Sequence, residues 1–180
     1  MKGIKRTLRE KIAHLRLLAG DTDAFGYFYD QYSKKIYRFV YFKTSDTEIA
    51  QDITHDIFLQ AWEYIMEHKS IDNFQAYLYR MARNKVIDYY RSKDRQTALL
   101  PEQPVSDSDQ LRTKALAELY VLEKHLKSLK PEYQEVVLLK HVEGLTTEEI
   151  SLVIEKDKNN VRVTLHRAMN KLKQLSQGDE

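Results

Sequence analysis

The sequence contains no cysteine, only five glycines and three prolines, and no long run of apolar residues. The absence of cysteine excludes disulfide bonds and thiolate metal sites, and it fits the reducing cytoplasm, where we expect the protein to act. The scarcity of glycine and proline argues against sheets with their tight turns. Because no apolar stretch approaches about 18 residues, we expect no membrane insertion. The basic residues 1–20 lack the apolar core of a secretory signal.

The net charge of +2 hides an uneven distribution of charge along the chain. Residues 46–67 contain six acidic side chains and no lysine or arginine. Residues 79–95 contain six basic side chains against two acidic ones, and residues 156–173 contain six against one. One acidic segment and two separate basic segments indicate one cationic protein partner and an extended polyanion.

Apolar residues with helical spacing predict three helices in the first half of the chain. The predicted helices cover residues 20–43, residues 47–67 and a third segment from about Phe74 to Arg95. The following segment, residues 96–112, holds two prolines and many small polar residues, which is typical of a linker.

Helical spacing resumes after this segment, and Pro131 and Gly144 mark the start and the end of one further helix. We therefore predict an all-α fold with two small helical domains, residues 20–95 and 113–177, joined by a flexible linker at 96–112.

The second predicted domain ends in the clearest motif of the sequence. Thr146 and Glu149 fit a capping box at the start of a short helix. A turn at Glu155–Lys158 follows, and a longer basic helix begins near Asn159. This order is typical of a helix-turn-helix, which places its second helix in the major groove of DNA. The alternative is an ordinary helical hairpin with a solvated basic face.

The outer face of the second helix carries the side chain types that read DNA. Arginine and asparagine make paired hydrogen bonds to base edges, and lysine suits phosphates. The predicted DNA-contacting residues are Lys158, Asn159, Asn160, Arg162, Val163, His166 and Arg167.

Several segments of the first predicted domain closely resemble region 2 of the sigma-70 family of RNA polymerase sigma factors. These segments are FYDQY (28–32), AQDITHDIFLQAW (50–62) and FQAYLYRMARNKVIDYYR (74–91), while residues 126–172 resemble region 4. Because the chain has no room for the further domains of larger sigma factors, the resemblance is to the extracytoplasmic-function (ECF) group. It implies a subunit without enzymatic activity or cofactor, which directs promoter recognition, DNA melting and transcription initiation.

The resemblance also implies how the acidic helix acts. It assigns docking on the β′ coiled coil of core RNA polymerase to Asp52, Asp56, Phe58 and Trp62. Asp52 and Asp56 lie four residues apart, on one helical face, as electrostatic docking needs. The alternative is a solvated acidic face, with Trp62 in the core. The β flap of the polymerase, promoter DNA and an anti-sigma factor are the other partners that the resemblance implies.

The third helix and the loop before it are implied to read the −10 promoter element. The residues assigned to this contact are Lys69, Asn73, Arg80, Arg83, Asn84 and Arg91. Tyrosines at 77, 79, 89 and 90 lie among them and suit stacking on unpaired bases, with burial in the core as the alternative for about half of them. The acidic linker is expected either to mimic nucleic acid in the polymerase or to act as a plain tether.

The recognition helix departs from the family pattern. Where relatives commonly have Gly-Thr-Val-Lys-Ser-Arg, residues 159–164 read Asn-Asn-Val-Arg-Val-Thr. This departure concerns which −35 sequence is read and leaves the fold unaffected.

Two other functions are consistent with parts of the sequence. A stand-alone regulator would use the helix-turn-helix, but it needs neither the acidic helix nor the tyrosine- and arginine-rich helix. A helical nucleic-acid enzyme would need a phosphate-binding or metal-binding motif, and the six histidines are scattered instead.

Overall fold

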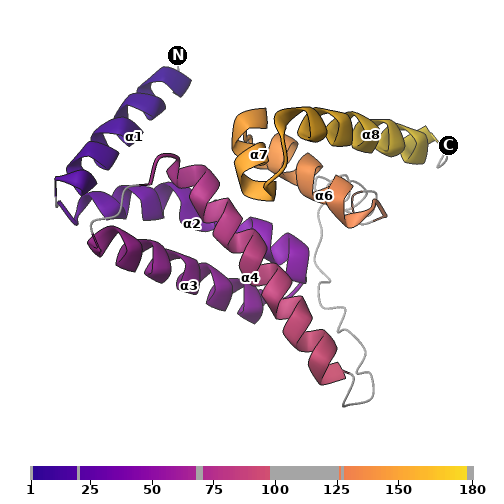
Figure 1. The fold of residues 1–180 in the computed structure, drawn as a ribbon, viewed down its shortest axis with the longest axis horizontal. Helices are drawn as coiled ribbons and strands as arrows, with labels where there is room; N and C mark the ends of the chain where they lie inside the picture. The colour runs from indigo at the N-terminus through magenta and orange to yellow at the C-terminus, as the bar shows by residue number, and fades with distance from the viewer. Residues whose placement is uncertain (1, 20, 68–70, 98–125, 127, 178–180) are drawn as a thin grey trace, which may run out of the picture. The chain divides into compact units, whose positions relative to one another are not determined.

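The structure of this chain is a computed structural model that describes residues 2–19, 21–67, 71–97, 126 and 128–177. They divide into two compact units, the first centred on helices α1–α4 and the second on α6–α8 (Figure 1). Every regular element of the described residues is a helix, so the predicted all-α fold is confirmed. Of the predicted linker only residues 96 and 97 are described, and the predicted domain boundaries stay a prediction.

The first unit contains helices α1 (Lys2–Leu18), α2 (Ala24–Thr44), α3 (Thr47–Met66) and α4 (Phe74–Thr97). The periodic patterns predict the last three to within four residues at each end. Asp46 caps α3, since its side chain accepts a hydrogen bond from the backbone N–H of Ile49 at 3.0 Å. Asn73 caps α4 in the same way, accepting from the N–H of Ala76 at 2.8 Å.

Aromatic side chains form much of the core of the first unit. The ring of Phe74, at the start of α4, lies 4.3 Å from that of Phe28 on α2, measured between centroids. Further along α4, Tyr79 meets Phe39 of α2 edge to face at 5.4 Å. Phe28, Phe39 and Tyr79 are fully buried. These contacts fix how α4 packs on α2, and therefore which of its side chains reach solvent.

Helix α1 is an additional helix that lies outside the three segments predicted to be helical in the first half of the chain. Ala13 and Leu17 are buried where α1 packs on α2, whereas Leu8, Ile12 and Leu15 are exposed. The exposed Leu8, Ile12 and Leu15 recur at helical spacing and form an apolar stripe on the side of α1 opposite the residues that pack on α2.

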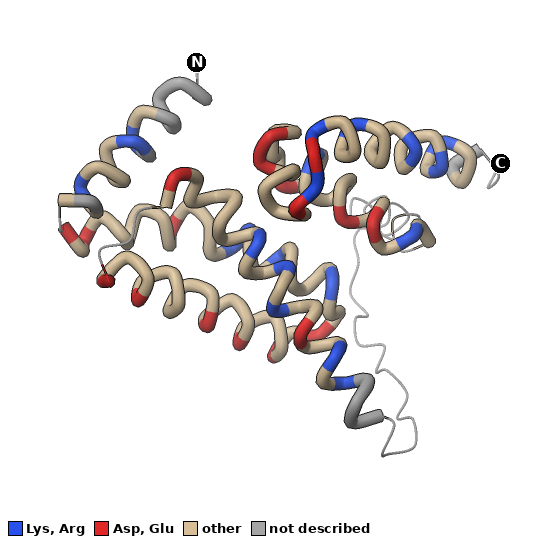
Figure 2. Tube along the Cα trace, in the orientation of Figure 1, with Lys and Arg blue, Asp and Glu red and all other residues tan. Residues whose placement is uncertain are grey.

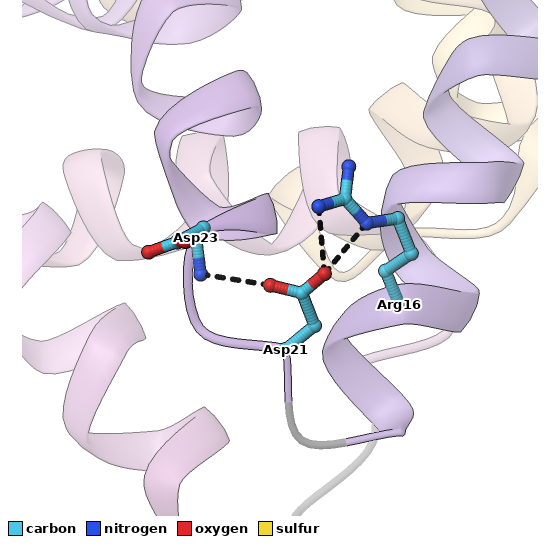
Figure 3. A network of polar contacts seen from close by, with 3 residues as sticks. All are labelled: Arg16, Asp21 and Asp23. Carbon is cyan, nitrogen blue, oxygen red and sulfur yellow. Dashed lines mark hydrogen bonds and ion pairs between the residues drawn. The ribbon is translucent and has the colours of Figure 1, made fainter.

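A polar network fixes the connection between α1 and α2 (Figure 3). Nη2 of Arg16 lies 2.6 Å from Oδ2 of Asp21, and its Nε donates to the same oxygen at 2.7 Å. The other carboxylate oxygen of Asp21 accepts from the backbone N–H of Asp23 at 3.2 Å. Asp21 thus links the last turn of α1 to the residue that precedes α2. The ion pair is exposed, so we expect it to contribute at most about 1 kcal/mol.

The second unit contains α6 (Pro131–Val137), the π-helical turn η1 (Leu138–Val142), α7 (Thr147–Ile154) and α8 (Lys158–Gln177). As predicted, a helix begins at Pro131 and the chain turns at Gly144, whose φ is 74°. The π turn is not predicted. It overlaps a run of four consecutive buried residues, 136–139, which are more than one face of a regular helix buries.

The helix-turn-helix predicted for α7 and α8 is confirmed. In the capping box, the N–H of Glu149 donates to Oγ1 of Thr146 at 3.2 Å, and the N–H of Thr146 donates to Oε2 of Glu149 at 2.7 Å. The turn begins at Glu155, which has the left-handed φ of 56°. Asp157 then caps α8, accepting from the N–H of Asn160 at 2.8 Å.

Replacing Phe28 with alanine tests the aromatic core. The substitution removes a fully buried ring from between α2 and α4, and we expect a loss of about 3–5 kcal/mol in the free energy of unfolding. Trp62, the single tryptophan, lies in the first unit, so its fluorescence during urea unfolding reports on that unit. The matched control is Tyr29→Ala, at the exposed neighbouring position, with an expected loss of about 1 kcal/mol. Equal losses for the two variants would contradict this description of the core.

Replacing Asp157 tests the cap of the second helix of the motif. Asp157→Ala removes the acceptor of the Asn160 N–H, and we expect it to weaken the first turn of α8 by about 1 kcal/mol. Amide hydrogen exchange of the full chain should show faster exchange at Asn160. Asp157→Asn is the control, because asparagine also caps helices and should keep the protection. Unchanged protection in Asp157→Ala would show that the cap is dispensable.

Candidate nucleic-acid interface

Helix α8 separates a buried face from a cationic face. Val161 and Ala168 are fully buried, and Leu165 and Leu172 are half-buried on the same side. Lysine and arginine residues recur along the helix (Figure 2). All seven predicted DNA-contacting residues of this helix are exposed: Lys158, Asn159, Asn160, Arg162, Val163, His166 and Arg167. The helix therefore presents a polar and cationic surface that includes two exposed apolar side chains, Val163 and Met169.

An ion pair at the start of α8 is not apparent from the sequence. Nζ of Lys158 lies 3.0 Å from Oε1 of Glu148, which belongs to the first turn of α7. The hydrogen bond from Lys158 lowers the pKa of the Glu148 carboxyl, and the charge of Arg162 acts in the same direction. A phosphate that binds Lys158 must therefore compete with a carboxylate that is already ionised.

Helix α4 carries a second cationic face. Arg80, Asn84 and Arg91 are exposed, and their spacing of four and seven residues places them on one side of the helix. Arg83 lies beside this face and is half-buried. Arg91 also pairs loosely with Asp88, at 4.0 Å. The four residues form a cationic stripe opposite the buried side of α4.

The tyrosines of α4 divide between the core and the surface. Tyr79 is fully buried against Phe39, so for this tyrosine the alternative of burial in the core holds. Tyr77 is half-buried and lies 5.4 Å from Tyr64 of α3 between ring centroids. The hydroxyl of Tyr90 donates to the backbone carbonyl of Lys43 at 2.7 Å, and burial raises the pKa of this hydroxyl.

Two predicted contacts to the −10 element belong to the segment before α4. The side-chain oxygen of Asn73 accepts the capping hydrogen bond from Ala76, so this atom already serves the helix. Lys69 lies outside the described residues.

Helix α3 carries an acidic stripe, defined by Glu48, Asp52, Asp56 and Glu63. All four are exposed, and their spacing of four, four and seven residues keeps them on one side of the helix. Figure 2 shows α3 with acidic and no basic residues along its length. The predicted docking residues Asp52 and Asp56 lie at the centre of this stripe.

The apolar residues of the stripe differ from those predicted. Phe58 is only 4% exposed and packs against Phe25 and Tyr29, so it is a core residue in this structure. Trp62 is half-buried, with its ring 5.1 Å from that of Phe25. Leu59 and Met66 lie on the acidic side instead, and each is 47% exposed. The shift from position 58 to 59 is a rotation of about 100°, which a spacing argument alone does not resolve.

One ion pair joins the acidic stripe to the cationic helix. Nζ of Lys85 on α4 lies 3.0 Å from Oδ2 of Asp56 on α3. The two residues are 29 positions apart, so the pairing depends on the packing of α3 with α4 and is not apparent from the sequence.

Among the described residues, no group of three or more histidine, aspartate or glutamate side chains is placed to hold a metal ion. None of the helices described here combines the length and the apolar character that crossing a bilayer requires.

Known proteins match both units. Residues 28–96 match the family Sigma-70 region 2, and residues 121–172 match the family Sigma-70, region 4. The ECF RNA polymerase sigma factor BldN of Streptomyces coelicolor is 30% identical over 172 residues, which cover 91% of this chain and 64% of BldN. The chain thus spans less than two thirds of the length of that relative.

Two further proteins agree with these matches. An RNA polymerase sigma-E factor of Streptomyces avermitilis is 30% identical over 131 residues, which cover 69% of each chain. The solved structure of the sigma factor RpoE from Bartonella quintana, in complex with the anti-sigma factor NepR, superposes with a TM-score of 0.68. That match covers 87% of this chain and 98% of the other at 19% identity, so it bears on the fold alone.

A stand-alone regulator would account for the second unit only, whereas the matches cover both units in the order that sigma factors have. The acidic helix and the tyrosine- and arginine-rich helix both fall within the region 2 match. The chain therefore belongs to the ECF group of the sigma-70 family, the transcription initiation subunits that let RNA polymerase recognise promoters.

Proposed function

We propose that this chain binds core RNA polymerase through the acidic stripe of α3 and promoter DNA through the cationic faces of α4 and α8. The observation that carries the proposal is the separation of charge. Two cationic helix faces belong to two different units, and the acidic stripe belongs to a third helix. An initiation subunit needs one surface for the polymerase and two for separate promoter elements. The proposed role is binding and not catalysis.

The polymerase surface is proposed to centre on Asp52 and Asp56, with Leu59 and Met66 as its apolar contacts. Exposed carboxylates steer a cationic partner such as the β′ coiled coil and set the register of docking. Exposed apolar side chains within the stripe add area that docking removes from water. Phe58 supports this surface from inside the core, and Trp62 lies at its edge. The β flap is proposed as the partner of the second unit.

The DNA surfaces are proposed to divide by promoter element. Arg80, Arg83, Asn84 and Arg91 of α4 would contact the −10 element, where cations and an amide serve backbone and unpaired bases. The exposed face of α8 would enter the major groove at the −35 element. Within that face, Val163 suits contact with a thymine methyl group, and Arg162 suits the paired acceptors of guanine.

An anti-sigma factor is proposed as a regulatory partner. The supporting observation is that RpoE, whose fold this chain shares, was solved with the anti-sigma factor NepR bound. We further propose that the chain acts in the cytoplasm, where core polymerase and promoter DNA meet.

Charge reversal at Asp52 tests the polymerase surface. Asp52→Lys places a cation against a cationic partner, so we expect affinity for core polymerase to fall at least about tenfold. The control is Asp30→Lys, which makes the same change of net charge at an exposed position of α2. Pull-down and fluorescence titration with purified core polymerase measure both variants. Equal affinities for the two variants would refute docking through the stripe.

Substitution of Arg162 tests sequence recognition by α8. Arg162→Ala should weaken binding of the reconstituted holoenzyme to the cognate promoter by about 1–3 kcal/mol, and run-off transcription from that promoter should fall accordingly. The mapped start sites and the affinity for core polymerase should stay the same. The loss should disappear on promoters changed at the base pair that Arg162 reads. Lys171→Ala, farther along the same helix, should weaken all promoters alike and lower the salt dependence. An equal loss on all promoters in Arg162→Ala would show that Arg162 contacts a phosphate instead.

The wild-type holoenzyme tests the proposed function as a whole. Its failure to select any transcription start site would refute that function.

A further inference from the structure

The ion pair between Asp56 and Lys85 joins the two helices that the proposed function assigns to different partners. Asp56 belongs to the acidic stripe that would face the polymerase. Lys85 follows Asn84 on α4 and lies beside the cationic stripe, one residue or about 100° around the helix. The 3.0 Å contact thus joins the acidic stripe to the helix that would face the −10 element.

The exposure of the two side chains is unequal. Asp56 keeps 55% of its side chain exposed, so a partner can reach its carboxylate without disturbing the core. Only 26% of the Lys85 side chain is exposed, so most of its aliphatic stem is covered while its ammonium group reaches Asp56. The flexible four-carbon stem lets its ammonium group leave Asp56 and turn toward a phosphate at the edge of the cationic stripe.

We propose that Lys85 is a further phosphate-contacting residue, which Asp56 holds in the free chain and which docking of a cationic partner on α3 releases. An arginine that binds a carboxylate through two nitrogens occupies both of its oxygens, so Asp56 cannot serve such an arginine and Lys85 equally. The proposal rests on the proposed function for the identity of that partner.

The exchange would couple the two binding events. Once the polymerase takes Asp56, the ammonium of Lys85 is available to the DNA backbone, and DNA that takes Lys85 leaves Asp56 available in return. Thermodynamic linkage requires the two effects to be equal in size. Exposed ion pairs contribute up to about 1 kcal/mol, so each partner should improve the binding of the other by about two- to fivefold.

The first experiment uses the full chain without polymerase. Fluorescence anisotropy measures binding to a short fluorescein-labelled single-stranded oligonucleotide over a range of salt concentrations. Asp56→Asn removes the carboxylate charge and releases Lys85. Asp52→Asn removes the same charge one turn away on the same stripe, and it sets the baseline for the general loss of negative charge. Melting curves check that both variants remain folded.

Release of Lys85 predicts a specific pattern. Asp56→Asn should bind the oligonucleotide about two- to fivefold more tightly than Asp52→Asn. The slope of the logarithm of the binding constant against the logarithm of the salt concentration should be steeper by about 0.7, which is the value for one added phosphate contact on a single strand. Adding Lys85→Gln to Asp56→Asn should remove both gains, whereas Lys85→Gln alone should have little effect. Equal binding by the two asparagine variants would overturn the proposal, as would an equal effect of Lys85→Gln in both backgrounds.

The second experiment uses reconstituted holoenzyme and a promoter fragment. Lys85→Gln should weaken DNA binding by the holoenzyme by about two- to fivefold while its affinity for core polymerase stays the same or rises slightly. Unchanged DNA binding by that holoenzyme would overturn the release step. If wild-type chain failed to bind core polymerase, the proposed function would fall, and the free-chain experiment would still decide whether Asp56 restrains Lys85.

Discussion

The packing of α4 on α2 through Phe74 and Tyr79 is the contact on which the first unit depends. Phe74 meets Phe28 at the first residue of α4, and Tyr79 meets Phe39 little more than one turn later. Two anchored rings leave α4 no freedom to rotate about its axis. The direction of every other side chain on the helix follows from them, including that of Arg80, which directly follows a fully buried residue. The core thereby determines which residues can meet a nucleic acid.

The same principle governs α8, with smaller side chains. Val161 and Ala168 bury one side of the helix, and the polar and basic residues occupy the other. The caps at Thr146 and Asp157 set where each helix of the motif starts, and hence the rotational phase of its side chains. In both units a proposed binding surface is the complement of a buried one. The charges themselves contribute little to folding, since they lie in water and are screened.

Much of this arrangement is predictable from the sequence because it is local. Apolar spacing gave α2, α3, α4 and α8, and the capping box gave the start of α7. The exposed set on α8 also followed from spacing, since seven of seven predicted residues face solvent. Family resemblance correctly indicated the sigma-70 family, which the matches to both regions bear out.

What the sequence did not predict depends on packing between helices. Phe58 and Leu59 are neighbours, and only the fit of α3 against Phe25 decides which of them is buried. The pairs Asp56–Lys85 and Glu148–Lys158 join separate helices and leave no periodic signal. Helix α1 was not among the predicted helices, although Leu8, Ile12 and Leu15 recur at helical spacing. The roles of the site residues stay predictions until binding is measured.

The left-handed residue between α7 and α8 has a consequence for how such a motif can diversify. Glycine adopts this conformation without penalty, whereas Glu155 carries a side chain there at a cost of about 1 kcal/mol or more. The backbone N–H of Glu155 keeps its hydrogen bond there, because it donates to the carbonyl of Ser151 at the end of α7. The surrounding unit therefore tolerates a Cβ atom at the bend, so this position is open to residues of either charge. A lineage can adjust the electrostatic attraction of the motif for DNA at the bend, without altering any residue that reads a base.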